Sequence, residues 1–312
     1  MPKAKPNKRD GSLDAADARD SDSVSVPPPP RSALKTTASA FSGLMPPAQQ
    51  MLDDAKAQLE AGVQLSLFQV APWSDNLRAL PNDVARMALF TTRNKRVPRA
   101  TMQNAPIFHI NKDVDVHYTG IELRAEDDEL VWQQVLEYAK RSPLGQPVTF
   151  SLYQICTDLG WSINGRYYRK IEECLARLQA SALQISSQRL GRLESLSLIG
   201  RFRVVERGRS GSICQVHMDE DMVMLFAGNH YTKLVWAPYR KLSPTARRLF
   251  DYCGSHKQPF PLELSKFRLM CRSDSVRDNK WREQTRQVCA ELVESGMVQK
   301  CWVSKDLVYF ER

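Results

Sequence analysis

The sequence predicts an α+β protein in which two tandem winged-helix domains follow a disordered N-terminal tail. The main observation is an internal repeat: the apolar pattern of residues 131–183 recurs at 245–297, without a gap, at a shift of 114 residues. Each copy reads as a helix, a proline-marked extended step, a short helix, a turn and a longer helix. After each long helix the apolar spacing changes to the two-residue period of strands.

The N-terminal region, residues 1–75, is expected to be a disordered tail because its first part is rich in Ser, Asp, Ala, Lys and Pro and lacks periodicity. Within it, AQQMLDDAKAQLEAG at 48–62 predicts one short amphipathic helix. The stretch QLSLF at 64–68 follows, with apolar side chains where no core is available. These side chains either dock on the first domain or bind another protein. The two folded domains are expected at 76–230 and 231–312.

The elements before the first long helix follow from local signals. A proline and an aspartate open an apolar run that predicts a helix at 81–91. Short strands are expected at 108–110 and 116–124. The stretch EDDELVWQQVLEYAKR at 126–141 is acidic at its start and basic at its end, as the helix dipole favours, and predicts the first helix of copy one.

The two copies align closely in their apolar positions. The gapless register pairs Tyr138 with Tyr252, Tyr153 with Phe267, Ile155 with Leu269, Tyr167 with Trp281, and Leu178 with Leu292. In copy one, strands at 193–206 and 213–219 flank the turn ERGRSGS, and in copy two strands at 298–303 and 307–311 flank Ser304, Lys305 and Asp306. A helix-turn-helix followed by a β-hairpin is typical of the winged helix.

The third helix of each copy is the candidate recognition helix. In copy one, a stripe from Tyr167 to Leu178 is expected to be buried, with Arg166, Arg169 and Lys170 pointing away from it and Tyr168 on its flank. In copy two, Lys280, Gln284 and Gln287 are expected to face outward, with Arg282 and Arg286 on one flank and Glu283 also outward. Arginine can pair with guanine, glutamine with adenine, and cations with phosphates. The alternative is a solvated basic helix face.

Two further basic segments are candidates for phosphate contact. The wing turn ERGRSGS carries Arg207 and Arg209, and the strand before it carries Arg201 and Arg203. The run TTRNKRVPR at 91–99 is expected to be a loop that is either a solvated linker or a second phosphate contact.

Composition narrows the class of protein. The formal net charge of +9 and pI near 9.2 favour polyanionic partners. We expect no membrane association because no apolar window of spanning length exists, and the seven scattered cysteines favour reduced thiols in a cytosolic protein. Phosphate-binding, nucleophile-elbow, zinc-protease and dinucleotide motifs are absent, so we expect no enzyme activity, no cofactor and no metal. The acids Asp127, Asp128 and Glu129 are interpreted as helix-dipole partners rather than nuclease ligands.

From about residue 46 onward the chain resembles the plasmid replication initiators, an iteron-binding family. The resemblance rests on QLSLF, on FSLYQICTDLGWSINGRYYRKIEECLARLQASAL and on KLSPTARRLFDYCGSHKQPFPLELSKFRLM. It implies two winged-helix domains that bind repeated origin sequences (iterons) in double-stranded DNA, an N-terminal domain that also serves dimerisation, and melting of an adjacent A·T-rich segment. The implied setting is the bacterial cytoplasm, with the protein on its plasmid or nucleoid.

The resemblance also implies a role for the tail. Gln64, Leu65, Ser66, Leu67 and Phe68 have the form of a peptide that binds the bacterial sliding clamp. Other implied partners are the host replicative helicase and initiator, A·T-rich single strands, and a second copy of the chain in a monomer–homodimer equilibrium. The alternative function is a dimeric transcriptional repressor that binds an operator, for which a clamp-binding peptide would have no use.

Overall fold

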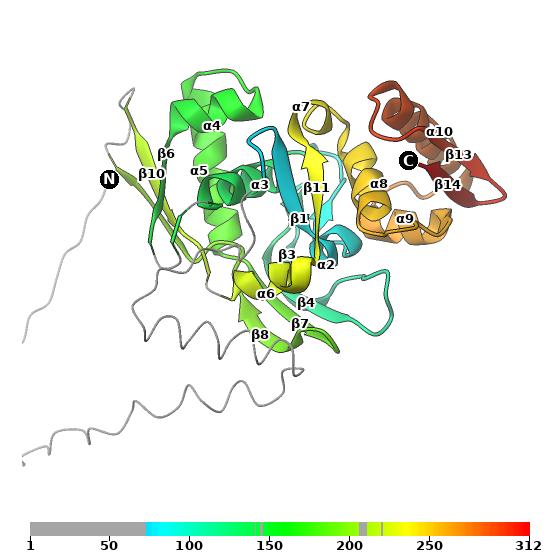
Figure 1. The fold of residues 1–312 in the computed structure, drawn as a ribbon, viewed down its shortest axis with the longest axis horizontal. Coiled ribbons are helices and arrows are strands. Elements are labelled where there is room, and N and C mark those ends of the chain that lie inside the picture. Colours follow the sequence, from blue (N-terminus) through cyan, green and yellow to red (C-terminus); the bar gives the residue numbers. More distant parts are fainter. Residues whose placement is uncertain (1–72, 141, 144–145, 206–210, 220) are drawn as a thin grey trace, which may run out of the picture. The chain divides into compact units, whose positions relative to one another are not determined.

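The protein has mixed helices and strands in its computed structural model, which describes residues 73–140, 142–143, 146–205, 211–219 and 221–312 (Figure 1). The expected helix at 48–62 and the QLSLF stretch lie outside the described residues, as do Arg207 and Arg209. The predicted combination of helices and strands is therefore confirmed for the described part of the chain.

Copy one of the repeat is built from three helices and a three-stranded antiparallel sheet. Its elements are α3 (Asp128–Ala139), β6 (Val148–Ser151), α4 (Leu152–Leu159), α5 (Gly165–Gln179), β9 (Arg201–Val205) and β10 (Ile213–His217). The strand order in the sheet is β6-β10-β9, so the last strand of the copy is central.

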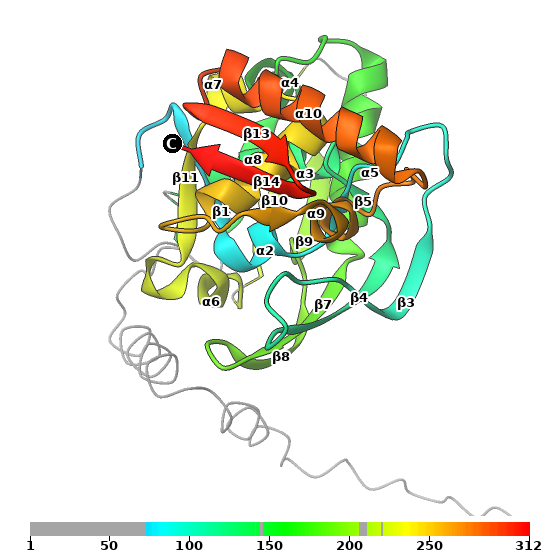
Figure 2. The same cartoon turned by 90° about the vertical axis from the view of Figure 1, so that its right-hand side faces the viewer.

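Copy two repeats this order of elements. It contains α8 (Pro244–Gly254), β12 (Leu262–Glu263), α9 (Leu264–Cys271), α10 (Asp278–Glu294), β13 (Lys300–Ser304) and β14 (Leu307–Glu311). Its sheet has the order β12-β14-β13, again with the last strand in the centre. Figure 2 views the molecule from the side of β13, β14 and α10. The predicted sequence of helix, strand, two helices and two strands is confirmed in copy two, whereas in copy one the strands β7 and β8 stand between the third helix and the last two strands.

The remaining elements include ones that pack against copy one and ones that pack against copy two. A four-stranded sheet has the order β3-β4-β7-β8, from β3 (Thr101–Pro106), β4 (Asp115–Ile121), β7 (Ala182–Ser187) and β8 (Gly191–Leu196). The other elements are β1 (Leu77–Pro81), α2 (Asn82–Arg86), β2 (Phe90–Thr91), β5 (Leu123–Arg124), α6 (Met222–Phe226), β11 (Tyr231–Val235) and α7 (Trp236–Tyr239). Because β1 pairs with β11, backbone hydrogen bonds cross the domain boundary expected after residue 230.

Three local predictions are wrong. The helix expected at 81–91 ends at Arg86, because Met87 has extended dihedrals and begins a continuous buried run that a surface helix would expose. Residues 108–110 form an isolated bridge through His109 rather than a strand. The strand expected at 193–206 is split between β8 and β9, and β8 pairs with β7 in a hairpin that completes the four-stranded sheet.

The gapless register of the repeat is wrong over the second helix. Tyr153 is 53% exposed whereas its expected partner Phe267 is fully buried, and Leu269 is 52% exposed whereas Ile155 is fully buried. The reason is the first strand of each copy. Because β12 is shorter than β6, helix α9 begins sooner after the start of its copy than α4 does after the start of copy one. A longer turn before α10 restores the register, so that the buried positions of α5 and α10 coincide again.

A buried ion network joins the first helices of the two copies. The guanidinium of Arg248 on α8 is fully buried and lies 3.5 Å from Oε1 of Glu129 on α3 and 3.0 Å from Oδ2 of Asp251. It also donates to the carbonyl oxygen of Met87 at 2.6 Å. Burial, and next the Glu129 carboxylate, raise the pKa of Asp251 well above its usual range. A buried charge left without partners is strongly unfavourable, so this network fixes α8 against α3.

Arg248→Ala should lower the free energy of unfolding by about 3–5 kcal/mol, because it leaves buried carboxyl groups and backbone carbonyls without their donor. The matched control is Arg286→Ala, since Arg286 forms an exposed pair with Glu283; it should change the unfolding free energy by less than about 0.5 kcal/mol. Urea unfolding followed by circular dichroism measures both. Equal shifts of the two midpoints would contradict the role given to Arg248.

Candidate nucleic-acid interface

Helix α5 presents a buried apolar stripe and an exposed basic face. Its first turn is capped by Asn164, whose side-chain oxygen accepts from the backbone N–H groups of Arg166 and Tyr167 at 3.1 Å. The stripe consists of Ile171, Cys174, Leu175 and Leu178, all fully buried. Arg166 and Arg169 are exposed, as the sequence predicts. The expected stripe is confirmed except that Tyr167 is half-buried.

The other two predicted contact residues of α5 are half-buried. The ammonium group of Lys170 lies 4.5 Å from the ring centroid of Trp161 and 3.9 Å from Oδ2 of Asp127. Tyr168 packs partly against the core. Lys170 is therefore held by a ring and a carboxylate, while the two arginines remain in solvent.

A basic cleft of about 530 Å³ opens beside the N-terminal half of α5. Its walls come from α5, from the loop at 91–99 and from the start of α3. Seven cationic side chains line it: Lys95, Arg99, Arg124, Arg166, Arg169, Lys170 and Arg177. Three acids also line it: Glu126, Asp127 and Glu173. The excess of cations makes the cleft suited to an anionic ligand.

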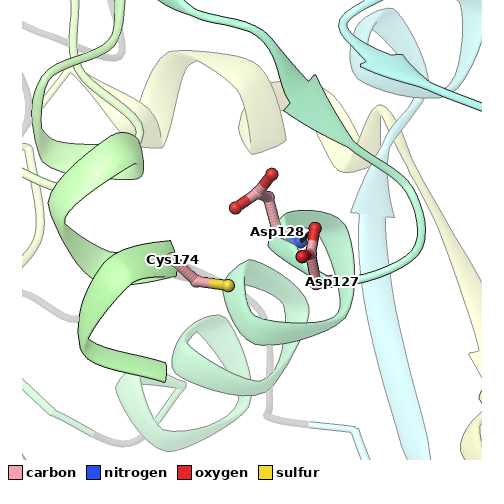
Figure 3. A group of neighbouring side chains, drawn as sticks. All are labelled: Asp127, Asp128 and Cys174. Atoms are coloured by element: carbon pink, nitrogen blue, oxygen red, sulfur yellow. Dashed lines mark hydrogen bonds between the residues drawn. The ribbon is translucent and has the colours of Figure 1, made fainter. Parts of the chain in front are cut away.

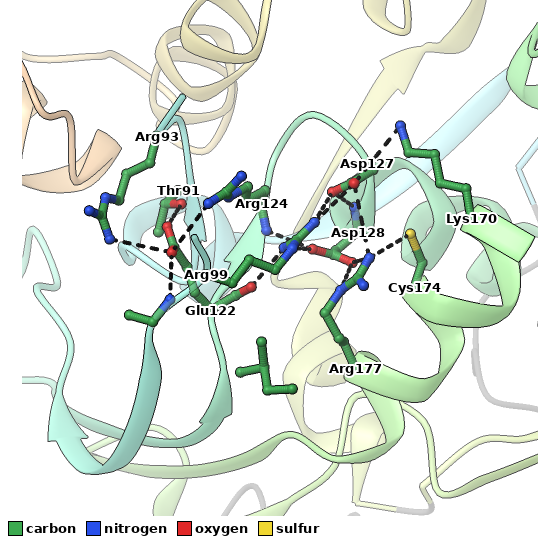
Figure 4. Close-up of polar contacts among 12 residues, drawn as sticks. Thr91, Arg93, Arg99, Glu122, Arg124, Asp127, Asp128, Lys170, Cys174 and Arg177 are labelled. Atoms are coloured by element: carbon green, nitrogen blue, oxygen red, sulfur yellow. Dashed lines mark hydrogen bonds and ion pairs between the residues drawn. The ribbon is translucent and has the colours of Figure 1, made fainter. Parts of the chain in front are cut away.

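The acids at the start of α3 organise the floor of this cleft (Figure 4). Both Nη atoms of Arg99 are engaged: Nη2 lies 2.9 Å from each oxygen of Asp127, and Nη1 lies 2.6 Å from Oδ2 of Asp128. Arg177 of α5 donates from Nε to the other oxygen of Asp128 at 2.9 Å. Although burial alone would raise it, the pKa of Asp127 is lowered by Arg99 and Lys170. Burial and the charge of Asp127 raise the pKa of Asp128 to about 6.

Asp127, Asp128 and Cys174 lie close enough to suggest a metal site (Figure 3). Their chemistry argues for an ion-pair network instead. The carboxylate oxygens already accept from Arg99 and Arg177, and cations at these positions repel a metal ion. Burial, and next the charge of Asp128, raise the pKa of the Cys174 thiol, which disfavours the thiolate that binds metals. Asp127 is the N-cap residue of α3, in agreement with its predicted place at the helix start.

The basic loop at 91–99 is packed against both copies rather than free in solvent. At one end, the Thr92 N–H donates to the carbonyl of Cys271 on α9 at 2.8 Å, and Arg93 Nε lies 2.9 Å from Asp274. At the other end, Arg99 binds the start of α3. Between these anchors Asn94, Lys95 and Arg96 are exposed. The loop prediction is confirmed, but the simple linker interpretation does not account for these anchors.

Helix α10 occupies in copy two the place of α5 in copy one. The expected buried stripe is confirmed, and consists of Trp281, Thr285, Val288, Cys289 and Leu292. On the opposite side Lys280 and Gln287 are exposed, while Gln284 is half-exposed. The side chains available on this helix are thus a lysine and two amides.

The flanking arginines of α10 are held by local acids. Arg282 donates from Nε to Oδ1 of Asp306, in the turn between β13 and β14, at 3.0 Å. Arg286 lies 3.4 Å from the carboxylate of Glu283 one turn away. The structure therefore brings α10 and the hairpin turn of its own copy together through Arg282.

Sequence reasoning missed two cations of the cleft. Arg177 and Arg124 line it but were not predicted as site residues. Arg177 lies two turns after Lys170 on the same side of α5, and this helical spacing was the available signal. Arg124 carried no such signal, because its position depends on β5 pairing with β2.

The comparisons with known proteins agree with the resemblance found in the sequence. Residues 37–312 match the family described as TrfA protein. The chain belongs to the TrfA family. It is 62% identical over 262 residues to the plasmid replication initiator protein TrfA of Escherichia coli, covering 84% of this chain and 68% of that relative. This relationship supports a role in the initiation of plasmid replication.

Solved structures give more distant likenesses to this TrfA-family chain. Domains 2 and 3 of RctB match with a TM-score of 0.45 and 11% identity, over 70% of this chain and 92% of the RctB chain. A second structure of the same domains matches with a TM-score of 0.47 and 12% identity, over 74% and 95%. Among the described residues of this chain, no helix has the length and apolar character needed to cross a membrane.

Arg169→Ala should lower the slope of log affinity for duplex DNA against log salt concentration by about one, because the exposed guanidinium is placed to neutralise one phosphate. The matched control is Arg192→Ala, which removes an exposed arginine of β8 that pairs with Glu194. Fluorescence anisotropy of a labelled duplex at several salt concentrations measures the slope. The same slope for Arg169→Ala and for the unmodified protein would remove Arg169 from the interface.

Proposed function

We propose that this protein initiates plasmid replication by binding origin iterons in double-stranded DNA through two winged-helix modules. The observation that carries this proposal is the repeated arrangement of elements: in each copy the second and third helices are joined by a turn, and the last two strands of the copy, which come later in the chain, pair with each other and with the first strand. Both third helices bury one face and expose a polar face that carries cations or amides. Membership of the TrfA family supports the same role.

In this proposal α5 and α10 enter successive major-groove segments of one iteron. The exposed arginines of α5 contact phosphates or guanine edges, and the basic cleft beside them takes the DNA backbone. On α10, Gln284 and Gln287 are placed to pair with adenine, which accepts and donates at adjacent major-groove atoms. Arg207 and Arg209, in the segment between β9 and β10, are proposed to follow the backbone beside the groove.

The loop at 91–99 is proposed as a third backbone contact. The loop is anchored at one end on Cys271 of α9 and at the other on the start of α3, and Lys95 and Arg96 lie between these anchors in the sequence. Cations in that position can bind the phosphates that separate two major-groove segments. Because ion pairs hold the loop in the absence of DNA, binding DNA does not require the additional free energy of ordering it.

The proposed mechanism is non-enzymatic and acts through binding energy. Several protomers on adjacent iterons bend the duplex, and A·T-rich steps yield first because they deform most easily. The protein then recruits the host replicative helicase, initiator and sliding clamp, and any ATP hydrolysis comes from those host proteins. We also propose that the chain interconverts between monomer and homodimer, contacts the exposed A·T-rich single strand, and acts in the bacterial cytoplasm.

Gln284→Ala should relax the base preference at one position of the iteron, by about 1–3 kcal/mol of discrimination, because an adenine loses its bidentate partner. Selection of bound duplexes from a random pool, with the unmodified protein and the variant, measures this preference at each position. Gln299→Ala is the control, since Gln299 lies beyond the end of α10. An unchanged selected motif with Gln284→Ala would contradict the placement of α10, and the absence of any selected motif with the unmodified protein would contradict the proposed function.

The double substitution Leu67→Ala and Phe68→Ala should abolish retention of purified bacterial sliding clamp, because these side chains are proposed to fill an apolar groove on the clamp. DNA binding should be unchanged, since the tail lies outside the two modules. Pull-down of the clamp with both proteins measures retention, with Leu59→Ala as a control for loss of apolar surface in the tail. Equal retention of the clamp by both proteins would exclude QLSLF as its binding peptide.

A further inference from the structure

Both recognition helices are preceded by an exposed aliphatic side chain. Ile163 lies directly before Asn164, the N-cap residue of α5, and is 50% exposed. Val276 lies directly before Arg277, the N-cap residue of α10, and is 89% exposed. Each copy thus has a β-branched apolar side chain directly before the N-cap residue of its third helix, although the two positions differ by one residue in the register that aligns the buried stripes.

Local packing does not explain Val276. An apolar residue before an N-cap often packs on the fourth residue of the helix, which in α10 is Trp281. That indole is instead covered by Phe267, with ring centroids 5.1 Å apart, and its N–H donates to the carbonyl of Leu264 at 2.9 Å. With 89% of its surface exposed, Val276 cannot contribute to this packing. Folding therefore gains little from an apolar side chain at this position.

The surroundings of Val276 combine an excess of cations with apolar side chains. Val276 lines a groove of about 680 Å³ together with Arg93, Arg268 and Arg272, the acid Asp274, and apolar side chains that include Phe108 and Leu269. Two of these arginines are paired, Arg93 with Asp274 and Arg268 with Asp278, so the cations exceed the acids without being unpaired throughout. Arg277 and Lys280, which follow Val276 in the sequence, are both exposed at the start of α10. An apolar side chain set among cations at the N-terminal end of a recognition helix lies where such helices meet base edges. Duplex DNA matches both the cations and the apolar side chain. Its phosphates can pair with the cations, and the C5 methyl group of thymine offers an apolar contact in the major groove.

We propose that Val276 in copy two, and Ile163 in copy one, read thymine through its C5 methyl group. This inference rests on the proposed DNA-binding function and specifies part of the sequence that is read. Thymine alone among the four bases presents a methyl group in the major groove, so apolar contact there distinguishes it from the other three. Each module then reads bases through an apolar contact at the helix start and through polar side chains along the helix.

Replacement of single thymines by deoxyuridine tests this contact, because it removes the methyl group and leaves base pairing intact. The probe is a duplex containing the site selected by the unmodified protein, with one thymine replaced at a time. Deoxyuridine at one position should weaken binding of the unmodified protein about fourfold, as expected for one methyl group taken from water. The Val276→Ala variant should bind the thymine-containing duplex and the duplex with deoxyuridine at this position with equal affinity.

The matched control is Val293→Ala, which makes the same substitution on a 40% exposed valine at the far end of α10. It should keep the full deoxyuridine effect. Ile163→Ala should remove the effect at a different thymine. If the Val276→Ala variant retains every deoxyuridine effect of the unmodified protein, or if there are none, the thymine inference is overturned while the proposed function stands. If the unmodified full-length protein selects no site at all, the proposed function fails instead.

Discussion

The burial of Arg248 is the constraint on which the arrangement of the two copies depends. A guanidinium withdrawn from water needs several acceptors, and here they come from three separate parts of the chain: the carbonyls of Ala85 and Met87, the Glu129 carboxylate of α3 and the Asp251 carboxyl of α8. These acceptors meet only when α8 lies against α3 and against the end of α2 with the residue that follows it. Since α5 packs on α3 and α10 packs on α8, the contacts of Arg248 also determine how the two candidate recognition helices are positioned.

The cations of the cleft beside α5 fall into two groups, according to whether buried acids hold them. Asp127 and Asp128 are buried and hold Arg99 and Arg177 at hydrogen-bond distance, so these arginines are committed to the fold. Their positive charge still contributes to the potential of the cleft, but their donors are largely used. Arg166 and Arg169 are exposed, and although Arg169 donates from Nε to the carbonyl of Gly165, its Nη groups are available for phosphate oxygens. The network therefore shapes the cleft, whereas the exposed pair is suited to bind the ligand.

Sequence reasoning predicted those features that depend on local periodicity and missed those that depend on pairing between distant segments. Helices α5 and α10 were predictable because buried residues recur at helical spacing, with Asn164 as a cap for the first. The β7–β8 hairpin was missed because its partner strand is β4, which lies far away in the sequence. The register error at α9 arose because a gapless comparison cannot detect that β12 is shorter than β6. Arg124 entered the cleft unpredicted for the same reason as the hairpin: strand pairing positions it.

The two recognition helices differ in a way that suggests separate tasks. On α5 the exposed Arg166 and Arg169 form no ion pair with the described residues, which favours tight but sequence-independent attraction to phosphates. On α10 the flanking arginines are paired, Arg282 with Asp306 and Arg286 with Glu283, and the remaining polar side chains include Gln284 and Gln287. When its arginines are paired with acids, a helix gains less binding free energy from phosphates at a DNA sequence that is not its target. Its affinity then depends more on hydrogen bonds to the correct base edges. In the proposed complex, copy one therefore contributes mainly affinity and copy two mainly specificity, and the rigid joint at Arg248 couples them.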